Sequence, residues 1–597
     1  MNIVAKIFKI LSSKEKKEAY KVFGMILIMA LLDMLGVASI MPFVAVISNP
    51  EIIETNKILN ITYIHMNEYG INSKNKFIFV LGVLTFLVLI LSLTFKALTV
   101  FFQTRFSLMR EYTIGHRLLS VYLNKPYSWF ITRNSADLSK NVLSEVNIVI
   151  SDVLIPFMNI TAQSCVSIAI LLLLLFIDPF LAISVATILI FSYGLVFYFT
   201  KNFLEKIGKQ RTLVNRKRYE TINEAFGASK EIKLGGLEHV YASRFSLPAE
   251  TYAKNLAAAN LIGQLPRFAL ELITFGGMLL VILYLMLQNS AFTNILPLLS
   301  LYVLAGYRLM PSMQGIYRSA TQLKFAISAL DGLLKELDNK KSFQKKSLIK
   351  SFELKKKIEL NNVTYNYPKS KKRAIENINL SIKAQTRVGF VGQTGSGKTT
   401  TVDLLLGLLQ PTSGTLKIDG KILNTLNLKK WQSIIGYVPQ QIYLADDTLA
   451  ANIAFGIAPE NINMQKVEEA AKSAELHHFV LKNLPKKYLT IIGERGVRLS
   501  GGQKQRIGIA RALYLEPKVL VLDEATSSLD TVTESAVIKS LKNIDNDLTI
   551  IMIAHRLSTI IECDQIYFFE DGKLISQGTY NELLKQNINF RAMHKQY

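Results

Sequence analysis

Gly392 Gln393 Thr394 Gly395 Ser396 Gly397 Lys398 Thr399 matches the phosphate-binding pattern G-x-x-x-x-G-K-[ST] at every specified position. Thr386–Val391 before it predicts a buried strand and Thr400–Leu409 after it predicts a helix, which is the context that the pattern requires. The glycines let backbone N–H groups surround phosphate oxygens, and the start of the helix adds partial positive charge. Lys398 would reach the β and γ phosphates, and the Thr399 hydroxyl would bind Mg²⁺. This stretch therefore predicts an α/β nucleotide-binding domain.

The composition divides the chain into two parts. Of the 597 residues, 50% are hydrophobic, and the mean hydropathy of +0.26 is too high for an ordinary soluble protein. The apolar runs lie before about residue 320, and several approach the roughly 20 residues that span a bilayer. We predict a transmembrane domain with long cytoplasmic helical extensions at residues 1–340 and a cytosolic α/β domain at residues 341–597.

The formal net charge of +24 has two interpretations. A protein that binds nucleic acid can be this basic, and so can a membrane protein whose Lys and Arg gather on its cytoplasmic side. The apolar runs favour the second interpretation, so no nucleic-acid partner is predicted. The two cysteines, Cys165 and Cys563, support neither a disulfide framework nor a cysteine metal site. Met1–Lys21 is not followed by a small-residue cleavage site, so no removable signal peptide is predicted.

The apolar runs predict a bundle of six membrane-spanning helices. They are Val22–Ile47, Phe77–Phe102, Leu154–Ile177, Phe180–Thr200, Phe268–Leu287 and Ile295–Met310. The turns at Asp178 Pro179 and Gln288–Asn294 are short, whereas the connections Gln103–Asp152 and Lys201–Arg267 are long, basic and helical in pattern. Basic connections stay in the cytoplasm. An even number of spans then leaves the N-terminus and the nucleotide-binding domain in the cytoplasm as well.

Five ionisable residues lie within the predicted spans or at their edges: Asp33, Lys96, Arg267, Glu271 and Arg308. Each charge costs about 2.5 to 3.5 kcal/mol at the middle of a bilayer, so these residues are expected to line a cavity or to pair with one another. Lys96 and Arg267 lie near span ends and could instead extend to the interface. Arg267 and Glu271, four residues apart, could neutralise each other. Three cations facing one cavity would suit a phosphate or pyrophosphate head group.

Two further segments carry alternative interpretations. Ser48–Lys76, the long external loop, is unusually apolar and predicts a short helix that contacts lipid or packs against its own bundle. The aromatic cluster Tyr127, Trp129 and Phe130, or the glycine-containing stretch Phe226–Leu237, could be where the membrane part docks on the nucleotide-binding part. An aromatic cluster of this kind is also typical of ordinary packing.

Further motifs surround the phosphate loop. Tyr367 precedes the loop and is positioned to stack on adenine, and the other motifs follow it: Tyr437–Gln440, Leu499–Gln503, Val519–Glu524, Ser527–Asp530 and His555. In this order they resemble the ATPase domain of ABC transporters across residues 354–597. Six spans ahead of such a domain resemble an ABC exporter half-transporter. The resemblance implies ATP hydrolysis coupled to transport, with ATP and Mg²⁺ as cofactors.

The resemblance also assigns roles. It implies that Asp523 binds Mg²⁺ with Thr399 and Gln440, that Glu524 deprotonates the attacking water, and that His555 contacts the γ-phosphate. Ser500 and Gly502 would close over the nucleotide of a second subunit. Since no motif position is degenerate, a homodimer with two composite ATP sites is favoured over a pair with one inactive site, and a different second subunit is the alternative. The predicted nucleotide-binding residues are Tyr367, Gly392, Gln393, Thr394, Gly395, Ser396, Gly397, Lys398, Thr399, Thr400, Ser500, Gly501, Gly502, Gln503 and Asp530.

The membrane part carries a second, less specific resemblance. Met41–Phe43, Phe95–Leu98, Leu265–Arg267, Tyr307–Ser312 and Ala510–Pro517 are similar to the bacterial flippases of lipid-linked oligosaccharides. This implies that Lys96, Arg267 and Arg308 line a cavity for the pyrophosphate and glycan, and that the external helix engages the polyprenyl tail. A lysine at position 96 keeps the charge without the bidentate geometry of arginine.

The expected function is therefore ATP-driven flipping of a polyprenyl-pyrophosphate-linked oligosaccharide across the bacterial inner membrane. The alternatives are an exporter of another glycolipid, a peptide or a drug, and a non-transporting regulatory ATPase. Six spans fused to a complete ATP site disfavour the last of these. The family motifs do not identify the glycan.

Overall fold

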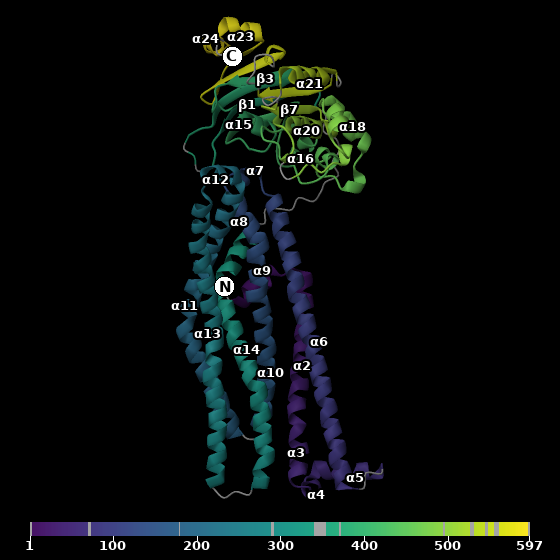
Figure 1. Ribbon diagram of the computed structural model, residues 1–597, viewed down its shortest axis with the longest axis vertical. Helices are drawn as coiled ribbons and strands as arrows, with labels where there is room; N and C mark the ends of the chain where they lie inside the picture. The colour runs from purple at the N-terminus through teal and green to yellow at the C-terminus, as the bar shows by residue number, and fades with distance from the viewer. Residues whose placement is uncertain are drawn as a thin grey trace. The chain divides into compact units, whose positions relative to one another are not determined.

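The computed structural model describes residues 3–69, 73–177, 179–287, 292–338, 354–368, 370, 372–493, 496–525, 530–543, 547–553 and 560–594. The chain divides into two compact units (Figure 1). The first unit is Met1–Lys125 with Arg133–Phe343, and the second is Pro126–Thr132 with Gln344–Tyr597. The second unit thus includes the predicted aromatic cluster, although the segments on either side of that cluster in the sequence belong to the first. The predicted domain boundary at 340/341 and the docking role of the cluster stay predictions.

The first unit contains helices and the turns between them, with no strand among its described residues. Its elements are α1 (Ile3–Ile10), α2 (Ser13–Ala38), α3 (Ile40–Ser48), α4 (Ile52–Thr55), α5 (Lys57–Glu68), α6 (Lys74–Leu123), α8 (Ser135–Lys140), the π-helix η1 (Asn141–Glu145), α9 (Val146–Val149), the π-helix η2 (Ile150–Leu154), α10 (Ile155–Ile177), α11 (Pro179–Gly227), α12 (Ser229–Gly235), α13 (Glu238–Leu287) and α14 (Phe292–Asp338). The long connections predicted to be helical are continuations of α6, α11 and α13. Each of these helices is far longer than the roughly 20 residues that cross a bilayer.

Three helical stretches of the described residues are long and apolar enough to cross a membrane: Ser13–Ser48, Lys74–Leu123 and Ser135–Ile177. They contain the first three predicted spans. The other three predicted segments lie in α11, α13 and α14, so the count of six spans stays a prediction.

The first predicted span, Val22–Ile47, is divided in the structure: α2 ends at Ala38 and α3 begins at Ile40. Pro42 explains the break, because it has no N–H to donate to the carbonyl of Ala38 and its ring would clash with that carbonyl. Ser39 closes α2 through its backbone N–H, which donates to the carbonyl of Leu35 at 2.9 Å.

The segment predicted as the external loop packs on its own bundle, and lipid contact by its other side stays a prediction. Leu59 of α5 is buried in a small apolar cluster with Val46, Ile53 and Phe77. On another side of the same helix, Ile58 is 76% exposed. One face of α5 therefore packs on its own bundle while another is left apolar and uncovered.

Helices α11 and α14 approach each other closely at Gly208. A Cβ atom at this position would lie 2.0 Å from the carbonyl oxygen of Phe325, so only glycine fits. The hydroxyl of Ser328 donates to the carbonyl of Gly208 at 3.2 Å and lies 3.0 Å from the hydroxyl of Thr212. Small residues at a helix crossing allow backbones to touch in this way.

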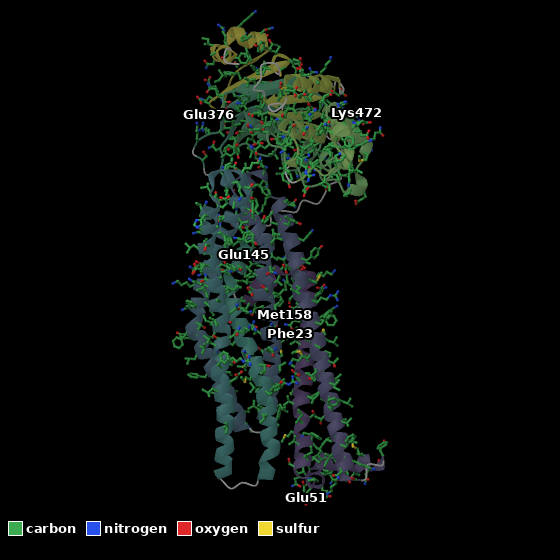
Figure 2. The ribbon with its side chains drawn as sticks, viewed as in Figure 1. Phe23, Glu51, Glu145, Met158, Glu376 and Lys472 are labelled. Carbon is green, nitrogen blue, oxygen red and sulfur yellow. The ribbon has the colours of Figure 1, made fainter. Side chains whose placement is uncertain are left out.

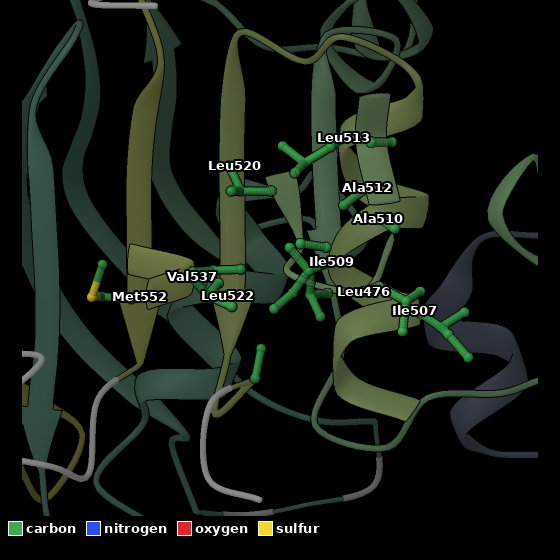
Figure 3. Packing of buried hydrophobic residues seen from close by; sticks show 14 of the residues in the cluster. Leu476, Ile507, Ile509, Ala510, Ala512, Leu513, Leu520, Leu522, Val537 and Met552 are labelled. Atoms are coloured by element: carbon green, nitrogen blue, oxygen red, sulfur yellow. The ribbon is translucent and has the colours of Figure 1, made fainter. Parts of the chain in front are cut away.

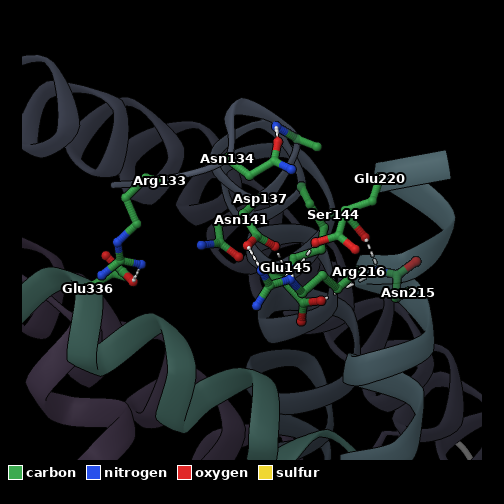
Figure 4. A network of polar contacts seen from close by, with 12 residues as sticks. Arg133, Asn134, Asp137, Asn141, Ser144, Glu145, Asn215, Arg216, Glu220 and Glu336 are labelled. Atoms are coloured by element: carbon green, nitrogen blue, oxygen red, sulfur yellow. Dashed lines mark hydrogen bonds and ion pairs between the residues drawn. The ribbon is translucent and has the colours of Figure 1, made fainter. Parts of the chain in front are cut away.

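A polar network joins α11 to α8 and η1 (Figure 4). Arg216 pairs with Asp137 at 3.0 Å, and the amide of Asn215 donates to the hydroxyl of Ser144 at 3.1 Å. Arg211, which is 1% exposed, pairs with Glu145 at 3.3 Å. The network therefore adds polar contacts between these helices to the apolar packing of the bundle.

Apolar side chains fill most of the space between α2 and α10. Phe23 and Met158, labelled in Figure 2, both line a cavity of about 220 Å³ that also reaches α1. Its lining is almost wholly apolar, so it belongs to the packing of the bundle.

The second unit contains two sheets and the short helices that cover them. Its strands are β1 (Lys357–Tyr365), β2 (Ile375–Lys383), β3 (Arg387–Gly392), β4 (Ser413–Ile418), β5 (Lys421–Ile422), β6 (Ile435–Val438), β7 (Val519–Asp523), β8 (Thr549–Ile553), β9 (Gln565–Glu570) and β10 (Lys573–Gly578). The helices are α7 (Tyr127–Ile131), α15 (Lys398–Leu405), α16 (Leu428–Gln432), α17 (Leu449–Ile453), α18 (Met464–Ser473), α19 (His477–Asn483), α20 (Gly501–Tyr514), α21 (Thr531–Asn543), α23 (Tyr580–Gln586) and α24 (Ile588–His594), with short 3-10 turns η3 (Pro459–Asn461) and η4 (Lys487–Leu489).

The larger sheet has the strand order β10-β9-β3-β8-β7-β6 and is parallel except for the β9–β10 pair. The smaller antiparallel sheet has the order β2-β1-β4-β5. In the larger sheet Ile553 pairs with Phe390 of β3 on one side and with Asp523 of β7 on the other. The carboxyl ends of β3 and β7 therefore meet at the same edge, which is where ligands bind in parallel sheets.

The central strands are buried on both faces. Leu520 and Leu522 of β7 pack in one apolar cluster with Met552 and Val537 (Figure 3), whereas Val521 of the same strand packs in the cluster on the opposite face. Continuous apolar runs of this kind are typical of parallel strands covered on both faces. The predicted strand Val519–Leu522 is therefore the middle of a double-sided core.

Candidate functional site

The phosphate loop connects β3 directly to α15, as the sequence predicts. Gly392, Gly395 and Gly397 have φ values of +151°, +83° and +99°, which favour glycine. A Cβ at Gly392 would lie 2.1 Å from the carbonyl oxygen of Phe569. The conformation and the space at the loop thus both require glycine, and its backbone is left free to surround a ligand.

Lys398 lies at the start of α15 and is 5% exposed. Its ammonium group donates to the carbonyl oxygens of Gly392 at 2.7 Å and Gln393 at 2.8 Å. Burial lowers the pKa of Lys398, while the carboxylates of Glu524 and Asp523 act in the opposite direction. The cation is therefore held inside the loop by neutral acceptors that a phosphate oxygen can replace.

Ser396 and Thr399 complete the loop. The hydroxyl of Ser396 is buried and has no hydrogen-bond partner among the described residues, which indicates a place for an absent polar ligand. Thr399 is exposed at the first turn of α15. An unpartnered buried hydroxyl, a glycine cradle and a buried lysine together fit the phosphates of a nucleotide.

Asp523 and Glu524 follow each other at the end of β7. Asp523 is 5% exposed, and the Tyr437 hydroxyl donates to its carboxylate at 3.4 Å. Glu524 has a φ of +50°, a conformation that is uncommon outside glycine and is concentrated at functional sites. The side-chain amide of Gln440 donates to the Glu524 carboxylate at 2.7 Å. The structure thus brings Gln440 and Glu524 together, and the carboxylate of Asp523 fits a divalent cation beside the phosphates.

Asp403 is a residue of this region that the sequence analysis missed. It lies in α15, and burial together with the charge of Asp523 raises its pKa to about 6. Burial of the Tyr437 side chain and the charge of Asp523 likewise raise the pKa of Tyr437. An acidic residue in the helix after the phosphate loop was the available signal, but its approach to Asp523 depends on how α15 packs against the sheet.

Tyr367 lies close to the loop, where adenine stacking was predicted. Its hydroxyl is 3.1 Å from that of Thr400, which is buried in α15. Its ring contacts that of Tyr365 edge to face, with centroids 5.2 Å apart. This arrangement holds the Tyr367 ring beside the phosphate loop, and stacking on adenine stays a prediction.

The predicted motif Leu499–Gln503 lies at the start of helix α20. Ser500 caps α20: its hydroxyl accepts from the backbone N–H of Gln503 at 3.3 Å, and the Gln503 side chain accepts from the backbone N–H of Ser500 at 2.9 Å. Gly501 and Gly502 form the first turn. Asp530 likewise accepts from the backbone and the hydroxyl of Thr533 at the start of α21. These contacts present the N-terminus of α20, whose partial positive charge suits an anion.

His555 lies outside the described residues, as do Ser527, Ser528 and Leu529 of the predicted motif. Their roles stay predictions.

In the first unit, two of the three predicted substrate cations meet on one carboxylate. Asp33 of α2 is 1% exposed. Its carboxylate is 3.1 Å from the ammonium of Lys96 of α6 and 3.5 Å from the guanidinium of Arg308 of α14. The hydroxyl of Ser92, one turn before Lys96, donates to the same carboxylate at 2.9 Å.

Arg267 lies in a separate ion pair. Its guanidinium contacts Glu271 at 2.6 Å, as the spacing of four residues predicts, and both side chains are partly exposed. Lys96 and Arg308 thus form a cluster with Asp33 and Ser92, which we call the Asp33 cluster, whereas Arg267 has its own carboxylate. That all three cations face one cavity stays a prediction.

Comparisons with known proteins agree with this architecture. A family model described as ABC transporter matches residues 375–527. The ATP-dependent lipid A-core flippase of Ralstonia nicotianae is 31% identical over 481 residues, which are 79% of this chain and 80% of that protein. The mouse protein ATP-binding cassette sub-family B member 5 is 42% identical over 235 residues, 39% of this chain and 18% of its own length. A solved structure of a bacterial Atm1-family ABC exporter with ATP bound has a TM-score of 0.80 at 20% identity, covering 97% of this chain and 98% of that one, so the two share a fold.

Proposed function

This chain belongs to the ABC transporters as a half-transporter of the exporter type that couples ATP hydrolysis to transport, and on that premise we propose that it flips a polyprenyl-pyrophosphate-linked oligosaccharide across a bacterial inner membrane. The orientation proposed is the one that places the basic helical extensions and the ATPase domain in the cytoplasm. A homologous lipid A-core flippase supports a lipid substrate of some kind. The pyrophosphate and the glycan are the parts of the proposal that the similarity to this flippase does not cover.

The Asp33 cluster is the observation that carries the choice of an anionic lipid. Two cations from α6 and α14 lie within a helical unit whose flanking residues are apolar, where each charge costs about 2.5 to 3.5 kcal/mol at the bilayer centre. One carboxylate does not neutralise two cations. The remaining positive charge supports a ligand with phosphate oxygens rather than a neutral or cationic drug.

The apolar face of α5 supports a lipid with a long tail. Ile58, Ile61 and Ile64 are 76%, 50% and 56% exposed. Exposed apolar residues on a short helix beside a membrane span are typical of segments that lie in the interface. We propose that this face contacts the polyprenyl tail.

In the ATP site, Lys398 and the backbone of Gly392–Gly397 would hold the phosphates of ATP. Glu524 would orient and deprotonate the attacking water, a task that needs a carboxylate within hydrogen-bond reach. Gln440 already binds the Glu524 carboxylate at 2.7 Å and would keep it aimed at the water. Thr399, Gln440 and Asp523 would hold Mg²⁺, which when bound neutralises charge on the phosphate oxygens.

We propose a homodimer as the working unit. Half-transporters of this fold typically function as dimers. Ser500, Gly501, Gly502 and Gln503 at the start of α20 would then face the nucleotide bound by the other copy, and the proposed contact of His555 with the γ-phosphate completes each site. Asp530 would approach the same interface from the start of α21.

Translocation of a polyprenyl-pyrophosphate glycan in proteoliposomes tests the proposal. Wild type should move the lipid with ATP, Glu524→Gln should not, and Arg308→Ala should reduce transport at least tenfold. Arg244→Ala is the matched control, because Arg244 forms an exposed pair with Glu224 in the extensions and should transport normally.

Two outcomes would redirect the proposal. If wild type hydrolyses ATP but leaves this lipid in place and moves lipid A-core instead, the homologous glycolipid becomes the substrate. If Arg308→Ala has no effect on transport of the polyprenyl lipid, the Asp33 cluster does not bind its pyrophosphate.

A further inference from the structure

The Asp33 cluster contains more than a pair of substrate-binding cations. Asp33 is itself fully withdrawn from solvent, with a side chain 0% exposed, whereas the side chains of Lys96 and Arg308 are 32% and 20% exposed. An incoming anion can therefore reach the cations while the carboxylate stays behind them. Any phosphate oxygen that binds these cations must compete with an acceptor that is already in place.

We propose that Asp33 is an internal counter-ion that competes with the phosphate groups of the lipid for Lys96 and Arg308, and so sets the affinity of the membrane unit for its anionic substrate. The inference rests on the proposed function, because it assumes that these cations receive a phosphate or pyrophosphate head group. It assigns to Asp33 the role of a positioning and affinity-setting residue that does not itself touch the lipid.

The geometry of the carboxylate supports this role. One oxygen, Oδ2, lies 3.1 Å from the ammonium of Lys96. The other, Oδ1, accepts from the hydroxyl of Ser92 at 2.9 Å and lies 3.5 Å from Arg308. The hydroxyl fixes the carboxylate in the orientation that faces both cations, and the long distance to Arg308 leaves that contact the weaker one.

Charge balance supports it as well. One carboxylate and two cations leave a net positive charge, so a doubly charged phosphate is attracted even while Asp33 is present. Without Asp33, a head group would bind more tightly and leave more slowly, because most differences in affinity between related complexes lie in the dissociation rate. A transporter must release what it carries. A fixed competitor beside the binding groups serves that release.

The test is equilibrium binding of a labelled polyprenyl pyrophosphate to the full chain in phosphatidylethanolamine nanodiscs, with saturating ADP to fill the nucleotide site. Asp33→Asn should lower the Kd at least fivefold, and Ser92→Ala, which loosens the carboxylate, should lower it about twofold. Asp33→Glu keeps the charge and should return the Kd towards the wild-type value. Glu250→Gln removes one carboxylate from an exposed pair with Lys254 and should leave the Kd unchanged.

A wild-type or higher Kd for Asp33→Asn, in protein that still hydrolyses ATP, would overturn the inference. If Asp33→Asn does not fold, the Ser92→Ala variant decides in the same way, because an unchanged Kd contradicts the counter-ion. If Asp33 has only a structural role, Asp33→Asn should lower protein stability without lowering the Kd.

A second probe separates this inference from the proposed function. Inorganic pyrophosphate, again with saturating ADP, presents the same anion without a lipid tail. If wild type neither binds nor moves the polyprenyl lipid but Asp33→Asn binds pyrophosphate more tightly than wild type does, the counter-ion stands and the proposed substrate fails. If the lipid is moved and neither probe distinguishes the variants, the substrate stands and the counter-ion fails.

Discussion

The ATP site and the Asp33 cluster both contain cations that contact oxygen acceptors, but the acceptors differ in charge. Lys398 donates to two backbone carbonyl groups of its own loop. Lys96 and Arg308 contact a full carboxylate from another helix. Neutral acceptors are readily replaced by phosphate oxygens, whereas a carboxylate competes with them. The ATP site is therefore arranged so that phosphate oxygens can replace its neutral acceptors. In the Asp33 cluster an incoming phosphate must compete with a carboxylate.

The largest expected effect concerns Glu524 of the ATP site. Glu524→Gln should lower ATP hydrolysis about 10²- to 10⁴-fold, because it removes the proposed base while leaving the loop that binds phosphate intact. ATP affinity should stay near the wild-type value, which equilibrium binding of a labelled nucleotide would show. Glu516→Gln, which removes an exposed carboxylate paired with Lys466, is the control and should hydrolyse normally. Near-normal turnover of Glu524→Gln would remove Glu524 from the chemistry.

A second prediction tests whether ATP binding requires glycine at position 392 of the phosphate loop. Gly392→Ala should cost about 3 kcal/mol and abolish measurable ATP binding, because the added Cβ would lie 2.1 Å from the Phe569 carbonyl oxygen. Gly420→Ala has a similar positive φ of +80° but open space around it, so it should cost only about 1 kcal/mol and bind ATP normally. Thermal unfolding in detergent and nucleotide titration measure both. Equal effects of the two changes would contradict the steric argument.

The third prediction tests whether Asp33 stabilises the two cations of the Asp33 cluster. Asp33→Asn should destabilise the protein by about 2 kcal/mol, because it leaves two cations without their carboxylate. Lys96→Gln should cost about 1 kcal/mol, since Asp33 keeps Arg308 and the Lys96 side chain is partly exposed. Unfolding midpoints in the same detergent would rank the two variants. The reverse ranking would show that Asp33 does not hold the cluster together.

The smallest effect concerns the pH dependence of the ATPase domain. The pKa of Asp403 is about 6 in the folded protein against an ordinary value of 3.8, so the folded state binds this proton more tightly than the unfolded state. The charged carboxylate therefore destabilises the fold above pH 6, and the cost disappears as the pH falls towards 4. Asp403→Asn should be more stable than wild type at pH 8 by about 1 kcal/mol after allowance for solvent screening.

Unfolding midpoints of wild type and Asp403→Asn at pH 8 and pH 5, without nucleotide and with a chelator, measure this difference. Asp446→Asn, at an exposed position, is the control and should shift the midpoint equally at both pH values. A stabilisation by Asp403→Asn that is the same at both pH values would contradict the titration of Asp403.

The two sites differ as much in how far the sequence predicts them. The phosphate loop is eight consecutive residues between a strand and a helix, so its conformation follows from local glycine chemistry. The pair of Arg267 with Glu271 was also predictable, because residues four apart share a helix face. The boundary between α2 and α3 at Ser39 was also predictable, from Pro42, and it lies inside the single candidate span Ser13–Ser48.

The Asp33 cluster could not be assembled in the same way. Its cations lie 63 and 275 positions from Asp33 in the sequence, as residues 96 and 308 against 33. Sequence reasoning named all three as ionisable exceptions. Which of them meet depends on how α2, α6 and α14 are rotated about their axes, and the apolar stretches of these helices carry almost no amphipathic pattern that would fix this rotation. The influence of Asp523 on Asp403 was missed for a related reason, because it depends on how α15 packs against the sheet that contains β7.

The contact at Gly208 limits how the first unit can move. Where α11 and α14 touch backbone to backbone, with hydroxyls bridging them, neither helix can slide along the other without losing that contact. The same two helices also pack at Tyr193 and Tyr317, whose ring centroids are 5.4 Å apart, so a rotation about Gly208 would separate these rings. We therefore expect this part of α11 and α14 to move as one rigid body.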